Sequence, residues 1–187
     1  MREYQVTDWC HSQVERYIRK GDLCIDATMG NGNDTEFLCR AVGETGRVLA
    51  FDIQQAALER TRKRLRENFD FCNYELILES HERMNIYAEA QSAGCIMFNL
   101  GYLPSGDHRL ATRPESTLKA LERALGLIRR GGVISVCIYS GGDSGFEERD
   151  AVLSWLRKLD GRQYLVLVTQ YYNRPNHPPT PALIVKL

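Results

Sequence analysis

The sequence lacks an excess of charge of either sign. Its 187 residues include 24 Lys and Arg and 24 Asp and Glu, so the formal net charge is zero. This balance gives no overall basic field of the kind that attracts nucleic acid and leaves room only for a local basic patch. The chain also lacks an apolar run of membrane-spanning length and an N-terminal signal-peptide core. We therefore expect a cytoplasmic protein with no membrane partner.

Metal and disulfide motifs are missing too. The six cysteines include no CxxC pair, and none stands at ligand spacing from a histidine. We therefore expect buried, reduced thiols and no metal. No repeat, low-complexity tract or dividing linker interrupts the sequence, so residues 1–187 should form one domain.

The one glycine-rich loop lacks a third glycine. An apolar run from Leu23 leads to Asp26, and Gly30 and Gly32 follow. An Asn-Asp-Thr set that can cap the next helix begins at residue 33. The dinucleotide fingerprint G-x-G-x-x-G would need a glycine where Thr35 stands. The order of strand, glycine turn and helix is nevertheless how a Rossmann-like fold holds a nucleotide-bearing cofactor. A plain turn between a strand and a helix is the alternative.

The loop has the form D-x-x-x-G-x-G, with the acid before the glycines. This order resembles motif I of class I S-adenosylmethionine (SAM) methyltransferases. SAM has no phosphate, so polar side chains and main-chain groups must hold its amino and carboxylate ends. The loop and the start of the next helix supply the predicted cofactor-binding residues: Asp26, Thr28, Gly30, Asn31, Gly32, Asn33, Asp34 and Thr35.

A second acid, Asp52, ends the apolar run 47–53, roughly 20 residues past the glycines. An acid at this offset accepts hydrogen bonds from ribose hydroxyls, and capping of the next helix is the alternative. Ile53 and Gln54 follow it and complete this part of the predicted cofactor site. Ser80 and His81 follow the next strand, where methyltransferases often place the adenine contact; a helix cap is equally favoured there.

Hydrophobic periodicity and turn residues predict alternating strands and helices. We expect strands at 23–28, 47–53, 74–79, 95–100, 133–139, 164–172 and 181–187, and helices ending near residues 20, 42, 68, 130 and 159. Thr7 or Asp8 would cap the first helix, in which Trp9 and His11 can face a ligand, and Gly131-Gly132 would end the fourth. The alternation predicts an α/β fold, and the resemblance to class I methyltransferases implies a Rossmann-like, seven-stranded, mostly parallel sheet of order 3-2-1-4-5-7-6, its last strand antiparallel, with helices on both faces.

The most informative stretch after the glycine loop begins at Asn99. Ligands of open α/β sheets bind outside the carboxyl ends of the strands, near the switch point, which puts Asn99 at the reacting end of the cofactor. Enzymes that methylate exocyclic amines are similar and carry (Asp/Asn)-Pro-Pro-Tyr there, whose acid or amide side chain accepts hydrogen bonds from the amine. Leu100-Gly101 replaces Pro-Pro here, and Tyr102 keeps the aromatic that can stack on a base.

The run from Asn99 to Pro104, followed by Gly106-Asp107, resembles the signature of a bacterial rRNA methylase family that includes the YtqB/MnmM-type tRNA methyltransferases. The likeness covers essentially the whole chain, with Asp26-Ala27-Thr28, Gly30-Asn31-Gly32, Asp52, Tyr139, Gly141-Gly142, Asn176 and Pro178-Pro179. It implies N-methylation of 5-aminomethyl-(2-thio)uridine at the tRNA wobble position to the 5-methylaminomethyl form. The implied partner is the anticodon stem-loop of tRNA.

Two departures from the family pattern concern proton transfer. His108 stands where lysine is expected, and residues 139–145 lack an expected histidine. Alkyl ammonium groups titrate well above pH 7, so the amine arrives protonated and a proton acceptor is needed. Asp107 and His108 are the candidates by position, and a turn cap is the alternative for Asp107. Asn99 and Tyr102 complete the predicted catalytic set.

Substrate contacts are expected from the loops at the same edge of the sheet: Leu100, Gly101, Tyr102, Thr112, Tyr139, Arg174 and Asn176. A rigid hairpin loop without a ligand is the alternative for the last two. The arginine-rich helix after Asp52 predicts a solvated face or a contact to RNA phosphate. Two other functions stay open: a methyltransferase for rRNA or a small-molecule amine, and a non-catalytic or NAD-binding Rossmann domain. The small size and the lack of an appended RNA-binding domain suggest a homodimer.

Overall fold

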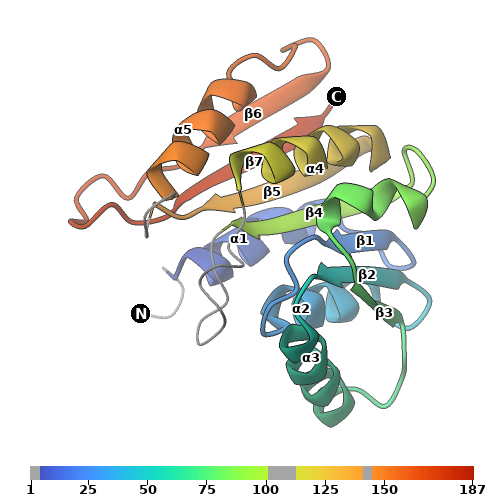
Figure 1. Cartoon of the computed structure of the whole chain (residues 1–187). Helices are drawn as coiled ribbons and strands as arrows, with labels where there is room; N and C mark the ends of the chain where they lie inside the picture. Colours follow the sequence, from blue (N-terminus) through green and yellow to red (C-terminus); the bar gives the residue numbers. More distant parts are fainter. Residues whose placement is uncertain (1–4, 101–112, 141–144) are drawn as a thin grey trace.

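Seven strands form one sheet in the order β3-β2-β1-β4-β5-β7-β6 (Figure 1). The computed structural model describes residues 5–100, 113–140 and 145–187. The strands are β1 (Leu23–Asp26), β2 (Arg47–Asp52), β3 (Tyr74–Leu78), β4 (Ala93–Leu100), β5 (Ile128–Ile138), β6 (Tyr164–Val168) and β7 (Thr180–Lys186). Strands β1 to β5 pair in parallel, whereas β7 is antiparallel to both β5 and β6. The predicted strand order and the antiparallel strand β7 are confirmed.

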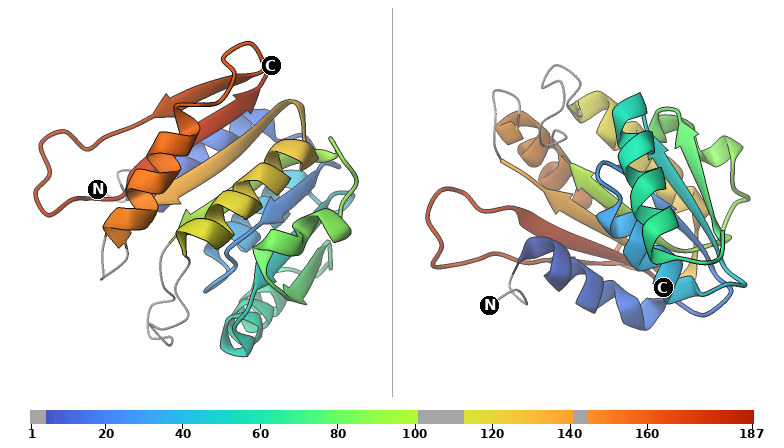
Figure 2. Two further views of the ribbon diagram at one scale, coloured as in Figure 1. Left: turned by 45° about the horizontal axis from the view of Figure 1, so that its top comes forward. Right: turned by 90° about the horizontal axis from the view of Figure 1, so that it is seen from below.

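Helices cover both faces of this sheet. They are α1 (Val6–Val14), α2 (Asn33–Val42), α3 (Gln55–Asn68), α4 (Pro114–Leu127) and α5 (Gly145–Leu156), with short 3-10 turns η2 (Glu15–Tyr17) and η3 (His81–Ile86). Figure 2 shows α4, α5 and η3 on one face and α1, α2 and α3 on the other. In the part of the chain that the structure describes, no helix is long and apolar enough to cross a membrane.

Alternation along the strands divides the core into two layers. Ile96 and Phe98 of β4 point to the layer covered by α4 and α5, which holds most of the large aliphatic side chains. Cys95 and Met97 point to the layer covered by α1 and α2, and all five buried cysteines lie in this second layer. Because both faces are covered, the central strands are mainly apolar, and most of their polar residues lie near the strand ends, with the buried Ser135 of β5 as an exception.

The carboxyl ends of β1, β2, β4 and β5 meet along one edge of the sheet. Asp26 at the end of β1 lies opposite Ala50 of β2 and Met97 of β4. Ile138 at the end of β5 lies opposite Thr180, the first residue of β7. The segment 169–179 between β6 and β7 therefore leaves the sheet at this same edge, and Figure 2 shows it extending away from the body of the protein.

Several predicted element ends are wrong. Helix α1 begins after Gln5, which makes no side-chain cap, and it ends at Val14, so Thr7 and Asp8 lie inside it rather than at its cap. Helix α4 ends at Leu127 and not near residue 130, because β5 already pairs with β4 at Ile128. The glycine pair 131–132 consequently lies inside β5. Strand β6 stops at Val168, four residues before the predicted end at Tyr172.

Candidate active site

The main chain of the glycine loop that follows β1 lies close to α3. Gly30 has φ of 51° and Gly32 has φ of 78°, a left-handed conformation that favours glycine. Gly32 is the N-cap of α2 and makes no side-chain cap bond, so the predicted Asn-Asp-Thr cap is wrong. A Cβ atom at Gly32 would lie 2.7 Å from Oγ1 of Thr61 in α3. Because the N-cap is a glycine, the first N–H groups of α2 have no capping side chain. A ligand carboxylate can accept hydrogen bonds from these groups.

Asp26 is fully buried beneath this loop. The Thr35 hydroxyl donates to its Oδ2 over 2.6 Å, and the Thr28 main-chain N–H donates to its Oδ1 over 3.1 Å. Burial, together with the nearby charge of Asp34, raises the pKa of Asp26 to about 8, although both hydrogen bonds act to lower it. With both oxygens engaged inside the protein, Asp26 shapes the loop and does not itself face a ligand.

The raised pKa of Asp26 has a consequence for stability. An unfolded Asp titrates near pH ~4, whereas the pKa of Asp26 is about 8 in the folded protein. Between these values the folded state holds the extra proton, so the free energy of unfolding falls as pH rises, by up to about 1.4 kcal/mol per pH unit. The Asp26→Asn substitution removes this titration, while its amide can accept from the Thr28 N–H and donate to the Thr35 hydroxyl.

We expect the stability of the Asp26→Asn variant to depend less on pH than that of the wild type. Urea unfolding at several pH values between about 5 and 8 measures the difference in slope. Parallel slopes for the two proteins would contradict a raised pKa at this position.

Asp52 ties the end of β2 to the glycine loop. Its Oδ2 accepts from the Gly30 N–H over 2.9 Å, and its Oδ1 accepts from the Gln54 N–H over 2.9 Å. Gln54 and not Asp52 is the N-cap of α3, so the capping alternative is wrong, although Asp52 still orders the residue before that helix. Ile53 beside it leaves 53% of its surface exposed, an apolar surface that an adenine ring can cover. The carboxylate and the apolar side chain suit a ribose and its base.

His81 lies behind the loop at the end of β3. Its Nδ1–H donates to the Ala27 carbonyl over 3.1 Å, and its ring meets the Phe98 ring edge-on at 6.0 Å. Burial lowers the pKa of His81, which favours the neutral ring with Nε2 free to accept a hydrogen bond. Ser80 is the N-cap of η3 and accepts from the Glu82 N–H over 3.3 Å. The capping alternative is therefore confirmed for Ser80.

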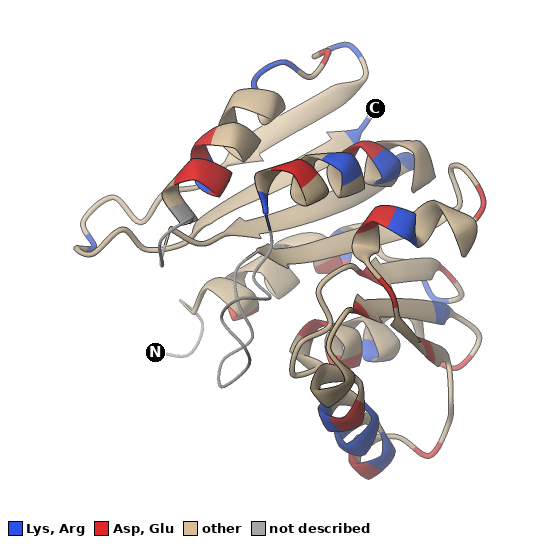
Figure 3. Ribbon diagram, in the orientation of Figure 1, with Lys and Arg blue, Asp and Glu red and all other residues tan. Residues whose placement is uncertain are grey.

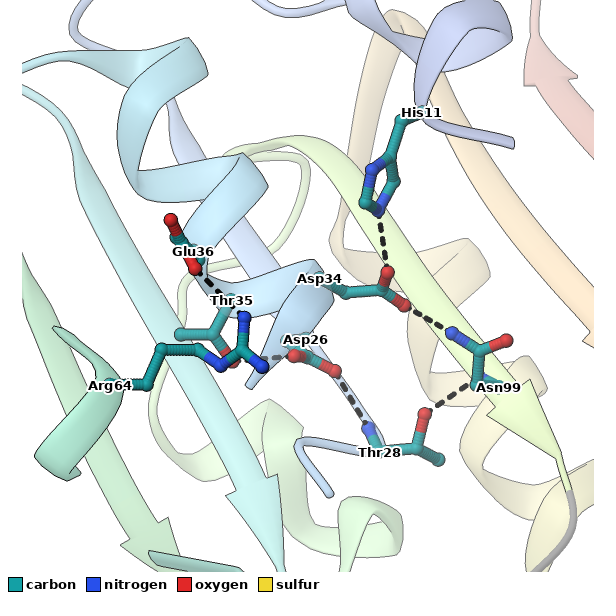
Figure 4. A network of polar contacts seen from close by, with 8 residues as sticks. All are labelled: His11, Asp26, Thr28, Asp34, Thr35, Glu36, Arg64 and Asn99. Atoms are coloured by element: carbon teal, nitrogen blue, oxygen red, sulfur yellow. Dashed lines mark hydrogen bonds and ion pairs between the residues drawn. The ribbon is translucent and has the colours of Figure 1, made fainter. Parts of the chain in front are cut away.

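Asn99 is held through both its main chain and its side chain (Figure 4). Its main-chain N–H donates to Oγ1 of Thr28 over 2.6 Å. Its Nδ2 donates to Oδ2 of Asp34, and Oδ1 of Asp34 accepts from Nε2 of His11 over 2.6 Å. The remaining atom, Oδ1 of Asn99, is shielded from solvent and has no hydrogen-bond partner within the described ranges. An orphaned carbonyl acceptor at the switch point of the sheet is suited to receiving an N–H group.

The other predicted site residues differ in burial, and some lie outside the described residues. Leu100 is fully buried in the core, so only its main chain can line the site. Asn31 accepts from the Arg60 guanidinium over 3.3 Å, and Asn33 is exposed at the start of α2. Tyr139 is 37% exposed just past the end of β5. Five predicted residues lie outside the described residues: Gly101, Tyr102, Asp107, His108 and Thr112.

The sequence missed how His11 is used. It suggested that His11 can face a ligand, but it gave no sign of the bond to Asp34 or of the stacking on Phe37, whose ring lies 4.0 Å away and within 5° of parallel. His11 and Asp34 are 23 residues apart on different helices, so no local spacing reveals the pair. In the described ranges no group of His, Cys, Asp and Glu side chains is arranged to hold a metal ion.

The polar and apolar groups that line this site fit SAM. Asp52 and the exposed Ile53 suit the ribose and adenine, and the uncapped N–H groups of α2 suit the carboxylate of the methionine moiety. Thr35 stands where the third glycine of a pyrophosphate-binding loop would be, and its side chain is buried and bonded to Asp26. This arrangement disfavours the NAD-binding alternative.

Comparisons with known proteins agree with this geometry. The family model described as "Putative rRNA methylase" matches residues 48–185. The "tRNA (mnm(5)s(2)U34)-methyltransferase, chloroplastic" of Arabidopsis thaliana is 36% identical over 183 residues, covering 93% of this chain and 67% of that protein. A structure from Clostridium thermocellum, described as a "putative rRNA-methylase", is 44% identical with a TM-score of 0.93, covering 97% of each chain. A "putative methyltransferase" from Streptococcus mutans, in complex with SAH, is 36% identical with a TM-score of 0.88, covering 98% of each chain.

The fold and the site together define a SAM-dependent methyltransferase. The chain belongs to the rRNA methylase family, whose model covers the sheet from β2 to β7.

Proposed function

We propose that the protein methylates the primary amine of 5-aminomethyl-(2-thio)uridine at the wobble position of tRNA, giving the 5-methylaminomethyl nucleoside. The observation that carries this proposal is the orphaned Oδ1 of Asn99 at the carboxyl edge of the sheet. A carbonyl oxygen in that place accepts an N–H from an amine and turns the nitrogen lone pair away from itself. The name of the Arabidopsis relative, a tRNA wobble-uridine methyltransferase, supports the choice of RNA and nucleoside.

Direct methyl transfer requires mainly that the protein position the amine against the methyl group. SAM, when bound, supplies an electrophilic methyl group. Asn99 orients the acceptor amine, and alignment of this kind accounts for a large part of the rate in direct transfer reactions. An amide cannot take up the proton that the amine must lose, so a separate acceptor is needed. Asp107 and His108 remain our candidates for that acceptor, and Tyr102 remains our candidate for stacking on the uracil.

The cofactor contacts that we propose follow the described geometry. Asp52 would accept from the ribose hydroxyls, Ile53 and His81 would line the adenine side, and the loop from Thr28 to Asn33 would hold the methionine moiety. Asp26 and Thr35 would act from beneath, because their bond to each other keeps the loop in shape.

We propose that a single loop supplies much of the RNA contact. On α3, five basic residues lie between Glu59 and Glu67 (Figure 3), but Arg64 pairs with Glu36 over 3.0 Å. Lys63 pairs with Glu67 over 3.9 Å. That helix is therefore better explained as a solvated face. By contrast, the segment 169–179 carries Arg174 as its one charged residue and Tyr172, which is 97% exposed. An exposed ring and a guanidinium on the same loop suit a nucleobase and a phosphate.

We expect Tyr172→Ala and Arg174→Ala each to raise the KM for tRNA by about tenfold, because each removes one stacking or phosphate contact. The value of kcat should change little, because neither residue is assigned to orient the amine. Arg162→Ala is the matched control: this arginine is also exposed but precedes β6, at the opposite end of that strand. Steady-state kinetics at two salt concentrations measure these effects. An unchanged KM in both loop variants would remove this surface from the proposal.

The proposed substrate also suggests where and how the protein works. A tRNA substrate is consistent with a cytoplasmic enzyme. A homodimer would extend the small RNA-facing surface, and the exposed Leu165 and Leu167 on one face of β6 offer an apolar strip for it. Sedimentation velocity would test this assembly, and a monomer at assay concentration would refute it.

A methylation assay tests the proposed function. Purified protein and labelled SAM are incubated with tRNA from cells whose wobble uridine stops at the aminomethyl stage, and the nucleosides are identified by mass spectrometry. Matched tRNA that is already fully methylated serves as the control. The expected result is labelled 5-methylaminomethyl-(2-thio)uridine from the first tRNA alone.

Absence of that nucleoside, with SAM binding intact, would refute the wobble substrate. The same assay with rRNA and with small primary amines then tests the second candidate function, a methyltransferase for one of those amines. That candidate rests on the same orphaned acceptor of Asn99, because a carbonyl oxygen suits a primary amine whatever molecule carries it.

A further inference from the structure

Three elements converge on the acceptor side chain. Helix α1 supplies His11, the first turn of α2 supplies Asp34, and the end of β4 supplies Asn99 (Figure 4). Nε2 of His11 donates to Oδ1 of Asp34 over 2.6 Å, and Nδ2 of Asn99 donates to Oδ2 of the same carboxylate. The Asp34 side chain is only 4% exposed and that of His11 17%. Two part-buried donors thus occupy both oxygens of one buried carboxylate.

This carboxylate decides which way the amide of Asn99 faces. An ionised carboxylate only accepts hydrogen bonds, so the NH2 group must face Asp34 and the carbonyl oxygen must face the other way. That oxygen is the atom that has no partner among the described residues. Rotation of the amide by 180° would exchange the two ends and present N–H groups to an incoming amine. Asp34 therefore gives the site an acceptor instead of a donor.

His11 holds the carboxylate in turn. Its ring is stacked on Phe37, one turn along α2 from Asp34, with the ring centroids 4.0 Å apart. The stacking fixes the ring plane, and the bond from Nε2 fixes one carboxylate oxygen, which leaves the other directed at Asn99. The pair thus couples the packing of α1 on α2 to the orientation of a side chain on β4.

We propose that His11 and Asp34 are positioning residues for methyl transfer, which act by fixing the carbonyl oxygen of Asn99 toward the acceptor amine. This inference rests on the proposed function in that an amine is the group that Asn99 meets. Neither His11 nor Asp34 needs to touch the substrate, and neither takes up a proton in this role.

Exchanging the two partner groups tests the proposal. In the Asp34→Asn variant the introduced carbonyl still accepts from His11, so its NH2 group faces Asn99 and forces that amide to turn round. In the Asn99→Asp variant two carboxylates oppose each other. Each single change should lower kcat by about 100-fold, because the acceptor is turned away or displaced. The double variant restores one donor and one acceptor in reversed order and leaves a carboxylate oxygen facing the amine, so its kcat should recover at least tenfold over the worse single variant.

His11 is tested by a graded pair. His11→Ala removes the donor and should lower kcat by about tenfold, whereas His11→Gln keeps an N–H at a similar reach and should retain most of kcat. The Kd for SAM, from calorimetry, should stay within about threefold of wild type in all these variants. Asp22→Asn is the matched control: it breaks the ion pair of a part-buried Asp with Arg129, 2.9 Å apart at the other edge of the sheet, and should lower Tm without lowering kcat.

Three results would overturn the proposal: a double variant no better than the worse single one, a His11→Gln variant as slow as His11→Ala, or losses confined to the Kd for SAM. A readout independent of turnover is hydrogen exchange of the Asn99 carboxamide, followed by NMR on protein with labelled asparagine. Exchange should accelerate in His11→Ala, and unchanged exchange would contradict the coupling. A wild-type enzyme that binds SAM but leaves aminomethyl-tRNA unmodified would refute the proposed substrate, while the carboxamide measurement still decides the positioning role.

Discussion

The Gly32→Ala variant should lose more than about 100-fold of its affinity for SAM and unfold more easily than the wild type. Gly32 has φ of 78°, and a Cβ atom there would lie 2.7 and 2.8 Å from the Oγ1 and Cγ2 atoms of Thr61. Thr61 is itself fully buried and donates to the Gly30 carbonyl over 3.3 Å, so it has no free space to move into. The clash would push the loop away from α3, and the left-handed backbone adds about 1 kcal/mol of strain.

Calorimetry with SAM and thermal unfolding measure the two effects. Removing the clashing atoms with Thr61→Ala in the Gly32→Ala background should restore part of the affinity, because the backbone strain remains. Gly126→Ala is the matched control, since Gly126 lies inside α4 with open space around a Cβ atom; it should gain about 0.5–1 kcal/mol of stability and bind SAM normally. Normal SAM affinity in Gly32→Ala would show that the close approach of this loop to α3 is not needed for the cofactor.

The sheet could be predicted from the sequence because its signals are local or repeat along the chain. Apolar runs that end in Asp26, Asp52 and Asn99 mark the carboxyl ends of three parallel strands, and these ends meet along one edge in the structure. The predicted end of α2 near residue 42 is confirmed, since Gly43 follows its last residue and an amphipathic pattern fills the helix. The order of the strands followed from resemblance to class I methyltransferases, because local patterns do not specify which strands pair.

The finer features of the site depend on contacts between distant segments, which no local pattern records. Gly32 replaces the expected polar cap of α2 because the loop must pack against Thr61, 29 positions further on. The early start of β5 depends on the pairing of Ile128 with Ala93. Likewise, Asp34 has the sequence signature of a cap or cofactor ligand, yet its partners are His11 and Asn99. Such roles are visible only once the helices are placed on the sheet.

Removing the acceptor itself should have the largest effect on turnover. The Asn99→Ala variant loses the carbonyl oxygen that we assign to the amine, and loss of one preorganised group of this kind lowers kcat by about 10²–10³-fold. The Asp34 carboxylate also loses one of its two hydrogen-bond donors, but His11 still donates to it. The main-chain N–H of residue 99 still donates to Thr28, so the neighbouring glycine loop keeps its shape. The Kd for SAM should therefore stay within about threefold of the wild type.

Single-turnover kinetics on aminomethyl-tRNA, together with calorimetry for SAM, separate these two effects. Asn73→Ala is the matched control: Asn73 is a buried asparagine whose Nδ2 donates to the Cys39 and Gly43 carbonyls over 3.0 and 2.9 Å, far from the carboxyl edge. That variant should lose stability and keep its rate of methyl transfer. If Asn99→Ala instead bound SAM poorly and transferred methyl at the wild-type rate once saturated, Asn99 would be a cofactor ligand. The orphaned oxygen would then have to be explained by the methionine moiety of SAM and not by the acceptor amine.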